Sequence, residues 1–190
     1  PRPETEELVY MMLQECGKTS NQEILDVGTG SGCIAISLKK NLKTAQVHAI
    51  DISEEALKIA YTNAKENGVE VHFKKDNALA LKADDYPKFH TIVSNPPYIA
   101  LSEKQNMHDN VVNFEPHLAL FVADDAPLIF YDKIADFALK NLYPNGLLFF
   151  EINQNLAVET QELIQKKGFE AQIIKDLNNN NRFIKAQLLG

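Results

Sequence analysis

Short apolar segments alternate with longer amphipathic ones along the chain, and turn residues separate most of them. The apolar segments predict seven strands, at residues 23–27, 46–50, 70–74, 90–94, 147–152, 170–176 and 182–189. The amphipathic segments predict five helices, at residues 4–15, 31–40, 53–67, 127–142 and 156–167. Residues 99–124 follow neither pattern, and long irregular segments inside compact domains are often functional.

Strands that alternate with helices predict an α/β fold with a doubly wound, mostly parallel sheet of seven strands. The last two strands are separated only by a short asparagine-rich loop at residues 178–181, so they are expected to pair antiparallel. Ligands of doubly wound sheets bind beyond the carboxyl ends of the strands. The residues that directly follow the strands are therefore the first candidates for a functional site.

A glycine-rich segment, DVGTGSG at residues 26–32, joins the first strand to the next helix. Glycine lets the backbone turn tightly and lets a ligand approach without interference from Cβ atoms. The dinucleotide-binding pattern GxGxxG requires a third glycine at the position of Cys33, so a nicotinamide oxidoreductase is disfavoured. A turn that only connects the strand to the helix is the alternative interpretation.

Carboxylates end the second and third strands. Asp51 stands where a carboxylate can accept hydrogen bonds from both hydroxyl groups of an adenosine ribose. Asp76 occupies the corresponding position after the third strand. Taken alone, each carboxylate is equally well explained as a solvated residue at a strand end. Their order along the chain, after a glycine loop, favours a nucleoside-binding site.

The segment Asn95-Pro96-Pro97-Tyr98 follows the fourth strand and suits transfer of a methyl group to a planar NH2 nitrogen. Such a nitrogen is a poor nucleophile because its lone pair is delocalised, as the ~18–20 kcal/mol barrier to peptide rotation illustrates. The Asn95 side-chain oxygen and the Pro96 carbonyl are expected to accept its two hydrogens, and Tyr98 to offer a flat face. The alternative is a proline-stiffened turn with a buried tyrosine.

The glycine loop, with its GxGxG spacing, resembles that of class I S-adenosylmethionine methyltransferases, which are Rossmann-like. Three further segments resemble the release factor glutamine methyltransferases of the HemK type: PRPETE at 1–6, NFEPHLAL at 113–120, and Asp176 followed by Asn181 and Arg182. The likeness covers the whole chain. Phe114 replaces the more usual tyrosine, and the loop before Arg182 is rich in asparagine instead of containing glycine. Arg182 itself is interpreted as a structural ion-pair partner of the acidic surface, with a functional role as the alternative.

The resemblance implies a cofactor, S-adenosyl-L-methionine, and a product, S-adenosyl-L-homocysteine. The implied substrate is a peptide-chain release factor, methylated on the glutamine of its Gly-Gly-Gln loop. The implied cofactor-binding residues are Asp26, Gly28, Thr29, Gly30, Ser31, Gly32, Asp51, Ile52, Asp76, Asn77 and Asn95. Asn95, Pro96 and Tyr98 would be catalytic, and the substrate-binding residues would be Asn95, Pro96, Pro97, Tyr98 and Glu115. Residues 1–190 would form the catalytic domain, without the helical N-terminal domain that this family carries.

Charge and composition narrow the alternatives. The net charge is −7, which argues against a nucleic-acid substrate because phosphate backbones favour basic surfaces. A DNA or RNA amino-methyltransferase with the same acceptor segment stays the main alternative, and a non-catalytic binding domain is a further one. The two cysteines and five histidines lack metal-ligand spacing, so no metal site is expected. No apolar run approaches the ~20 residues that span a bilayer, and a cytoplasmic location is expected.

Overall fold

The computed structural model describes residues 2–17, 20–97, 99–100, 121–122 and 126–189. Two residues of the predicted acceptor site, Tyr98 and Glu115, therefore lie outside the described residues, as does most of the predicted irregular segment. Its described ends form two short strands, β5 (Ile99–Ala100) and β6 (Phe121–Val122), which pair in parallel.

The fold is built on a seven-stranded sheet, as predicted. Its strands are β1 (Glu23–Val27), β2 (Gln46–Asp51), β3 (His72–Lys75), β4 (Phe89–Ser94), β7 (Leu142–Glu151), β8 (Phe169–Lys175) and β9 (Asn181–Leu188). They lie in the order β3-β2-β1-β4-β7-β9-β8. β9 pairs antiparallel with both β7 and β8, and the other pairs of this sheet are parallel, so the predicted antiparallel pairing of the last two strands is confirmed.

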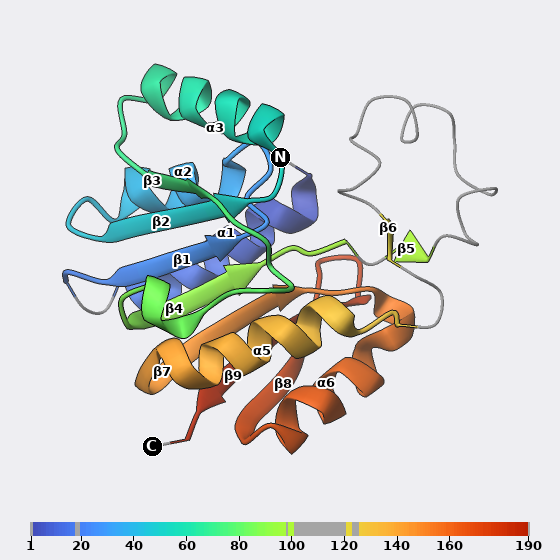
Figure 1. Cartoon of the computed structure of the whole chain (residues 1–190). Helices are drawn as coiled ribbons and strands as arrows, with labels where there is room; N and C mark the ends of the chain where they lie inside the picture. Colours follow the sequence, from blue (N-terminus) through green and yellow to red (C-terminus); the bar gives the residue numbers. More distant parts are fainter. Residues whose placement is uncertain (1, 18–19, 98, 101–120, 123–125, 190) are drawn as a thin grey trace.

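Helices cover both faces of the sheet (Figure 1). The helices are α1 (Pro3–Cys16), α2 (Cys33–Asn41), α3 (Glu54–Glu66), α5 (Ile129–Asn141) and α6 (Ala157–Lys166). Apolar side chains of α1, α2 and α3 form one core with the sheet, and those of α5 and α6 form a second core on the opposite face. None of the helices in the described ranges is both long and apolar enough to cross a membrane.

Local chemistry explains where α3 begins and ends. Ser53 precedes the helix in an extended conformation, and its hydroxyl accepts a hydrogen bond from the Ala56 amide at 3.2 Å. Gly68 follows the helix with a positive φ of 65°, a conformation that glycine adopts without strain. Both boundaries agree with the sequence-based prediction, and the helix starts directly beyond the end of β2.

The strand β7 begins earlier than predicted. The sequence placed its start at residue 147, after a turn at residues 144–146, but β7 starts at Leu142. Leu142 pairs with Phe89 of β4, and the register then shifts so that Leu147 pairs with Thr91. Asn145, with a φ of 62°, lies inside this irregularity. The turn chemistry was interpreted correctly, but it makes a bulge within a strand instead of preceding one.

Helix α1 is attached to the C-terminal strands and to the loop between β8 and β9 by three polar contacts along its length. The Thr5 hydroxyl donates to Glu151 at the end of β7 at 3.1 Å. A carboxylate oxygen of Glu7 accepts from the Leu177 amide at 3.0 Å, and Lys185 of β9 donates to Glu15 at 2.7 Å. The first helix of the chain therefore spans the last strands of the sheet.

Candidate functional site

Hydrogen bonds hold the carboxyl ends of four neighbouring strands together. The Gly28 and Thr29 amides both donate to the Ile50 carbonyl at 2.9 Å, which joins the loop after β1 to β2. The Asp76 amide donates to the Asp51 carbonyl at 3.1 Å, which joins the ends of β3 and β2. On the other side, the Ser94 hydroxyl donates to the Val27 carbonyl at 2.7 Å. The structure thus brings together all four strand ends that the sequence singled out.

Two glycines of the loop face open space. Gly28 and Gly30 have φ values of 75° and 56°, which other residues adopt only with strain. A Cβ atom added to either would meet no heavy atom within 4 Å. The loop therefore leaves a space beside its backbone that these residues do not fill, as a ligand-binding loop requires.

Gly32 has a packing role in the same loop. Its φ is 84°, and a Cβ atom there would lie 2.9 Å from Ile36 Cδ1 and 3.1 Å from Ala60 Cβ. The glycine thus allows α2 and α3 to approach each other. Its predicted contact with a cofactor remains a prediction, as does that of the neighbouring exposed Ser31, whose carbonyl accepts from the Asn63 side chain at 2.9 Å.

Asp51 shapes the loop as well as ending β2. Its Oδ2 accepts from the Gly30 amide at 2.8 Å, and its Oδ1 accepts from the Ser53 amide at 2.9 Å. Each carboxylate oxygen can accept a further hydrogen bond, so the side chain is oriented and still able to bind hydroxyl groups. Ile52, directly after it, is 49% exposed, which places an apolar surface beside the carboxylate.

Asp26 is a fully buried carboxyl group at the end of β1. Its Oδ2 accepts from the Thr29 hydroxyl at 2.6 Å, whereas Oδ1 has no hydrogen-bond partner of good geometry among the described residues. Burial raises the pKa of Asp26 to about 7, the negative charge of Asp51 adds to this, and the Thr29 hydroxyl and Ala35 amide only partly oppose it. A cationic ligand would favour the ionised form, so the site suits a positively charged group.

Donors of the surrounding protein already contact both carboxylate oxygens of Asp76. Its Oδ2 accepts from the Tyr86 hydroxyl at 2.5 Å and from Lys74 Nζ at 3.0 Å, and its Oδ1 accepts from the Asn77 amide at 2.8 Å. Partial burial raises the pKa of Asp76, but these donors outweigh it and hold the pKa below its usual value. The expected contact of Asp76 and Asn77 with an adenine ring stays a prediction, and Tyr86 was not foreseen.

The acceptor segment lies directly beside the glycine loop. Asn95, Pro96 and Pro97 follow β4, whose last residues pair with the end of β1 on one side and of β7 on the other. Asn95 and Pro97 are partly exposed and Pro96 is buried. Asn95, Pro96 and Pro97 therefore lie at the end of the strand that directly neighbours the strand of Asp26, close to Gly28.

The arrangement fits a cationic ligand that carries hydroxyl groups. Asp26 supplies an unpaired buried oxygen, Gly28 and Gly30 leave open space, and Asp51 presents an oriented carboxylate. The described residues contain no group of three or more His, Cys, Asp or Glu side chains that could hold a metal ion.

Comparison with known proteins identifies the chain. The family model called methyltransferase small domain matches residues 5–116. A release factor glutamine methyltransferase of Flavobacterium psychrophilum is 52% identical over 97% of this chain and 66% of its own length. A second, from Lactococcus lactis subsp. lactis, is 44% identical over 97% of this chain and 67% of its own length. The chain belongs to the release factor glutamine methyltransferase family. It spans about two thirds of the length of these relatives.

Solved structures agree with this family at the level of the fold. A methyltransferase from Pyrococcus furiosus matches with a TM-score of 0.70 and 20% identity, over 95% of this chain and 81% of the other. The class I methyltransferase fold expected from the glycine loop is therefore confirmed.

Two features of the chain were not fully predicted from its sequence: the buried Glu151 and the ion-pair partner of Arg182. Glu151, buried at the end of β7 and bonded to Thr5, was not singled out. Its signal was present, because a lone acid that ends an apolar strand is the same pattern that drew attention to Asp51. Arg182 pairs through Nε with Asp176 Oδ2 at 3.2 Å, so it is an ion-pair partner as interpreted, but of a buried carboxylate and not of the acidic surface.

Asp176 explains the asparagine-rich loop between β8 and β9. Its buried carboxylate accepts from the Asn178 and Asn180 amides at 3.0 and 2.9 Å, in addition to Arg182. The Asn180 amide and the Arg182 guanidinium keep the pKa of Asp176 below its usual value. The aspartate and arginine of this pattern therefore hold a hairpin tip, with Asn179 in the left-handed conformation.

Proposed function

We propose that this chain uses S-adenosyl-L-methionine to methylate the side-chain amide nitrogen of glutamine in the Gly-Gly-Gln loop of peptide-chain release factors. The observation that carries the proposal is the 52% and 44% identity, over 97% of the chain, to proteins named for this reaction. We place the catalytic part in residues 1–190. The position of Asn95-Pro96-Pro97 beside the glycine loop supports the proposal independently of the names.

The cofactor would be held by the loop after β1 and the end of β2. S-adenosylmethionine supplies an electrophilic methyl group on a positively charged sulfonium. Asp26, with Gly28 and Gly30, would face this positive end, and Asp51 would accept from the ribose hydroxyls. The partly exposed Ile52 would contact the adenine.

Glycine substitutions separate the backbone role of the loop from its ligand role. Gly30→Ala and Gly68→Ala both place a Cβ atom at a positive φ with no neighbour within 4 Å, so each should lower the free energy of unfolding by about 1 kcal/mol. Only Gly30→Ala should also weaken cofactor binding, because only its Cβ enters the proposed site. Calorimetric titration and thermal unfolding of both variants measure the two effects, and equal cofactor affinities would contradict the assignment.

Asn95 and Pro96 would orient the glutamine amide for reaction. The Asn95 side-chain oxygen and the Pro96 carbonyl would each accept one N–H, so that the nitrogen lone pair points out of the amide plane. Acceptors at these positions also favour the positive charge that develops on nitrogen as it is alkylated, and the proton is lost afterwards. No strong base is needed, and the rigid Pro96-Pro97 pair keeps both acceptors in place.

A labelling experiment tests the proposal directly. The chain is incubated with methyl-labelled S-adenosylmethionine and a purified release factor, its Gln→Ala loop variant, DNA or RNA. Label on the unmodified release factor alone is the expected result. Label on the Gln→Ala variant would contradict the assignment of the acceptor atom. Label on DNA or RNA would favour the amino-methyltransferase of nucleic acid, which the net charge of −7 argues against.

A further inference from the structure

Glu151 is a buried acid for which the proposed reaction has no assigned use. It ends β7 and is 1% exposed. The preceding residue, Phe150, pairs with Ser94 at the end of β4, so Glu151 and Asn95 occupy the next positions on neighbouring strands. Adjacent strands lie about 4.8 Å apart, so Glu151 is one strand from the acceptor segment and two strands, about 9.6 Å, from the glycine loop.

The side chain of Glu151 faces α1. Its Oε2 accepts from the Thr5 hydroxyl at 3.1 Å, and Thr5 lies in the first turn of that helix. Burial raises the pKa of Glu151, while Thr5 and the positive charges of Arg182 and Arg2 act in the opposite direction. The carboxyl group is thus the point at which β7, β9 and the start of α1 meet.

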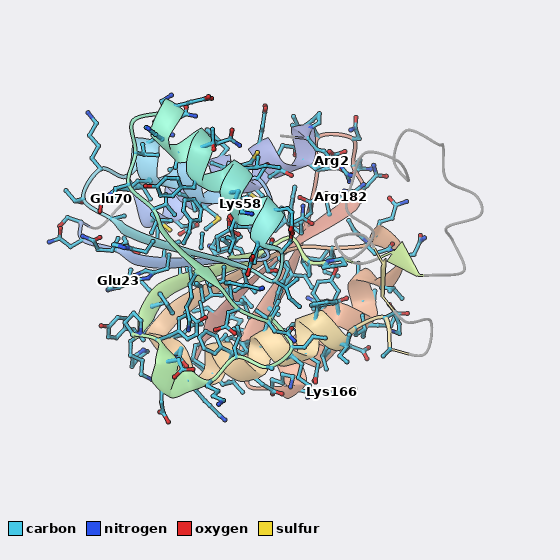
Figure 2. The ribbon with its side chains drawn as sticks, turned by 45° about the horizontal axis from the view of Figure 1, so that its top comes forward. Arg2, Glu23, Lys58, Glu70, Lys166 and Arg182 are labelled. Carbon is cyan, nitrogen blue, oxygen red and sulfur yellow. The ribbon has the colours of Figure 1, made fainter. Side chains whose placement is uncertain are left out.

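Both arginines lie at the same end of the molecule. Figure 2 shows Arg2 and Arg182 close together on the side opposite Glu23, which begins β1 at the amino edge of the sheet. Arg2 precedes α1, and its carbonyl accepts from the Glu6 amide at 3.2 Å. The Arg182 carbonyl accepts from the Ile152 amide at 2.8 Å, directly after Glu151. Guanidinium groups donate well to the carbonyl oxygens of an extended peptide.

We propose that Glu151 is a positioning residue of the acceptor site, which fixes the first turn of α1 next to Arg182, at the strand ends that neighbour Asn95, and so sets the affinity for the protein substrate. This inference rests on the proposed function. When the substrate glutamine reaches Asn95, the residues that flank it in its loop should contact the carboxyl edge of the sheet. The first turn of α1 and Arg182 lie at this edge. The greater distance of Glu151 from the glycine loop means that cofactor affinity depends on it much less.

Three variants separate this role from general stabilisation. Glu151→Gln retains an oxygen for the Thr5 hydroxyl but removes the charge, and Thr5→Val removes the hydrogen bond but retains the charge. Glu15→Gln is the matched control, because it removes the charge that pairs with Lys185 of β9 farther along the helix. Steady-state kinetics with the release factor, cofactor titration by calorimetry and amide hydrogen exchange of residues 4–9 are measured for each.

Glu151→Gln and Thr5→Val should raise the KM for the release factor on the order of tenfold, with cofactor Kd changed less than about twofold. Both should speed hydrogen exchange in the first turn of α1, whereas Glu15→Gln should leave KM and this exchange unchanged. A KM unchanged in both variants, or a shift in cofactor Kd alone, overturns the proposal.

The exchange measurement does not depend on the substrate. Absence of methyl transfer to the release factor by the unsubstituted chain would count against the proposed function. Unchanged exchange in the first turn of α1 would overturn the positioning role, whatever the substrate proves to be. If Glu151→Gln fails to fold, Thr5→Val, which alters only the helix side of the contact, provides both measurements.

Discussion

Asn95→Ala should abolish methyl transfer to the release factor while cofactor binding stays nearly unchanged. The substitution removes the side-chain acceptor for one amide hydrogen, so the nitrogen is no longer held with its lone pair toward the methyl group. Loss of one preorganised hydrogen-bonding group at a reacting centre typically lowers kcat on the order of 10²–10³-fold. Asn95 follows β4 and is only partly buried, so the fold should tolerate the change.

Two further variants make this result specific. Asn95→Asp keeps an acceptor oxygen and should lose less activity than Asn95→Ala. Asn67→Ala, at the end of α3 remote from β4, should behave like the unsubstituted chain. Single-turnover rates and calorimetric cofactor affinities are the measurements. Near-normal turnover of Asn95→Ala would refute the acceptor assignment.

Asp26→Asn should make the protein more stable at about pH 8 and weaken cofactor binding at least tenfold. Burial raises the pKa of Asp26 from 3.8 to about 7. The folded protein therefore holds a proton that the unfolded chain releases, and its stability falls as the pH rises from about 4 to about 7. A shift of about three units corresponds to about 4 kcal/mol as an upper bound, and asparagine removes this effect.

The same substitution removes the negative charge that would face the sulfonium. Asp26→Asn should therefore increase the stability of the fold at high pH and, at the same time, weaken cofactor binding. Thermal unfolding between about pH 5 and pH 8 should show the advantage of Asp26→Asn growing with pH. Asp84→Asn, on the exposed surface, is the control and should show no such trend. An advantage that does not grow with pH would contradict the ionisation argument, and an unchanged cofactor Kd would contradict the ligand role of Asp26.

The sequence predicts the strand ends well because buried strands have a strong local signal. A polar residue stood at or near the end of each of the first four apolar segments, and the parallel fold brought Asp26, Asp51, Asp76 and Asn95 to one edge. Boundaries set by local chemistry, such as the Ser53 cap, were also predictable. Such features depend on residues close together in the chain.

Contacts between distant residues were not predictable in the same way. The Tyr86 hydroxyl reaches Asp76 only because the chain returns beside the end of β3, and the pairing of Leu142 with Phe89 depends on strand registration. The contact of Thr5 with Glu151 joins residues 146 positions apart. No periodicity or turn signal encodes such pairs, so the polar surroundings of the site came from the structure alone.

The attachment of α1 to the last strands has a consequence for how the chain folds while the ribosome synthesises it. Glu7 and Glu15 each contact residues 170 positions later, so α1 can complete these polar contacts only after β9 has been made. Synthesis at about 5–20 residues per second separates α1 from these polar partners by roughly ten seconds or more, while its apolar face can already pack against α2. A nascent chain therefore completes the attachment of α1 at the carboxyl edge of the sheet only after β9 has been synthesised.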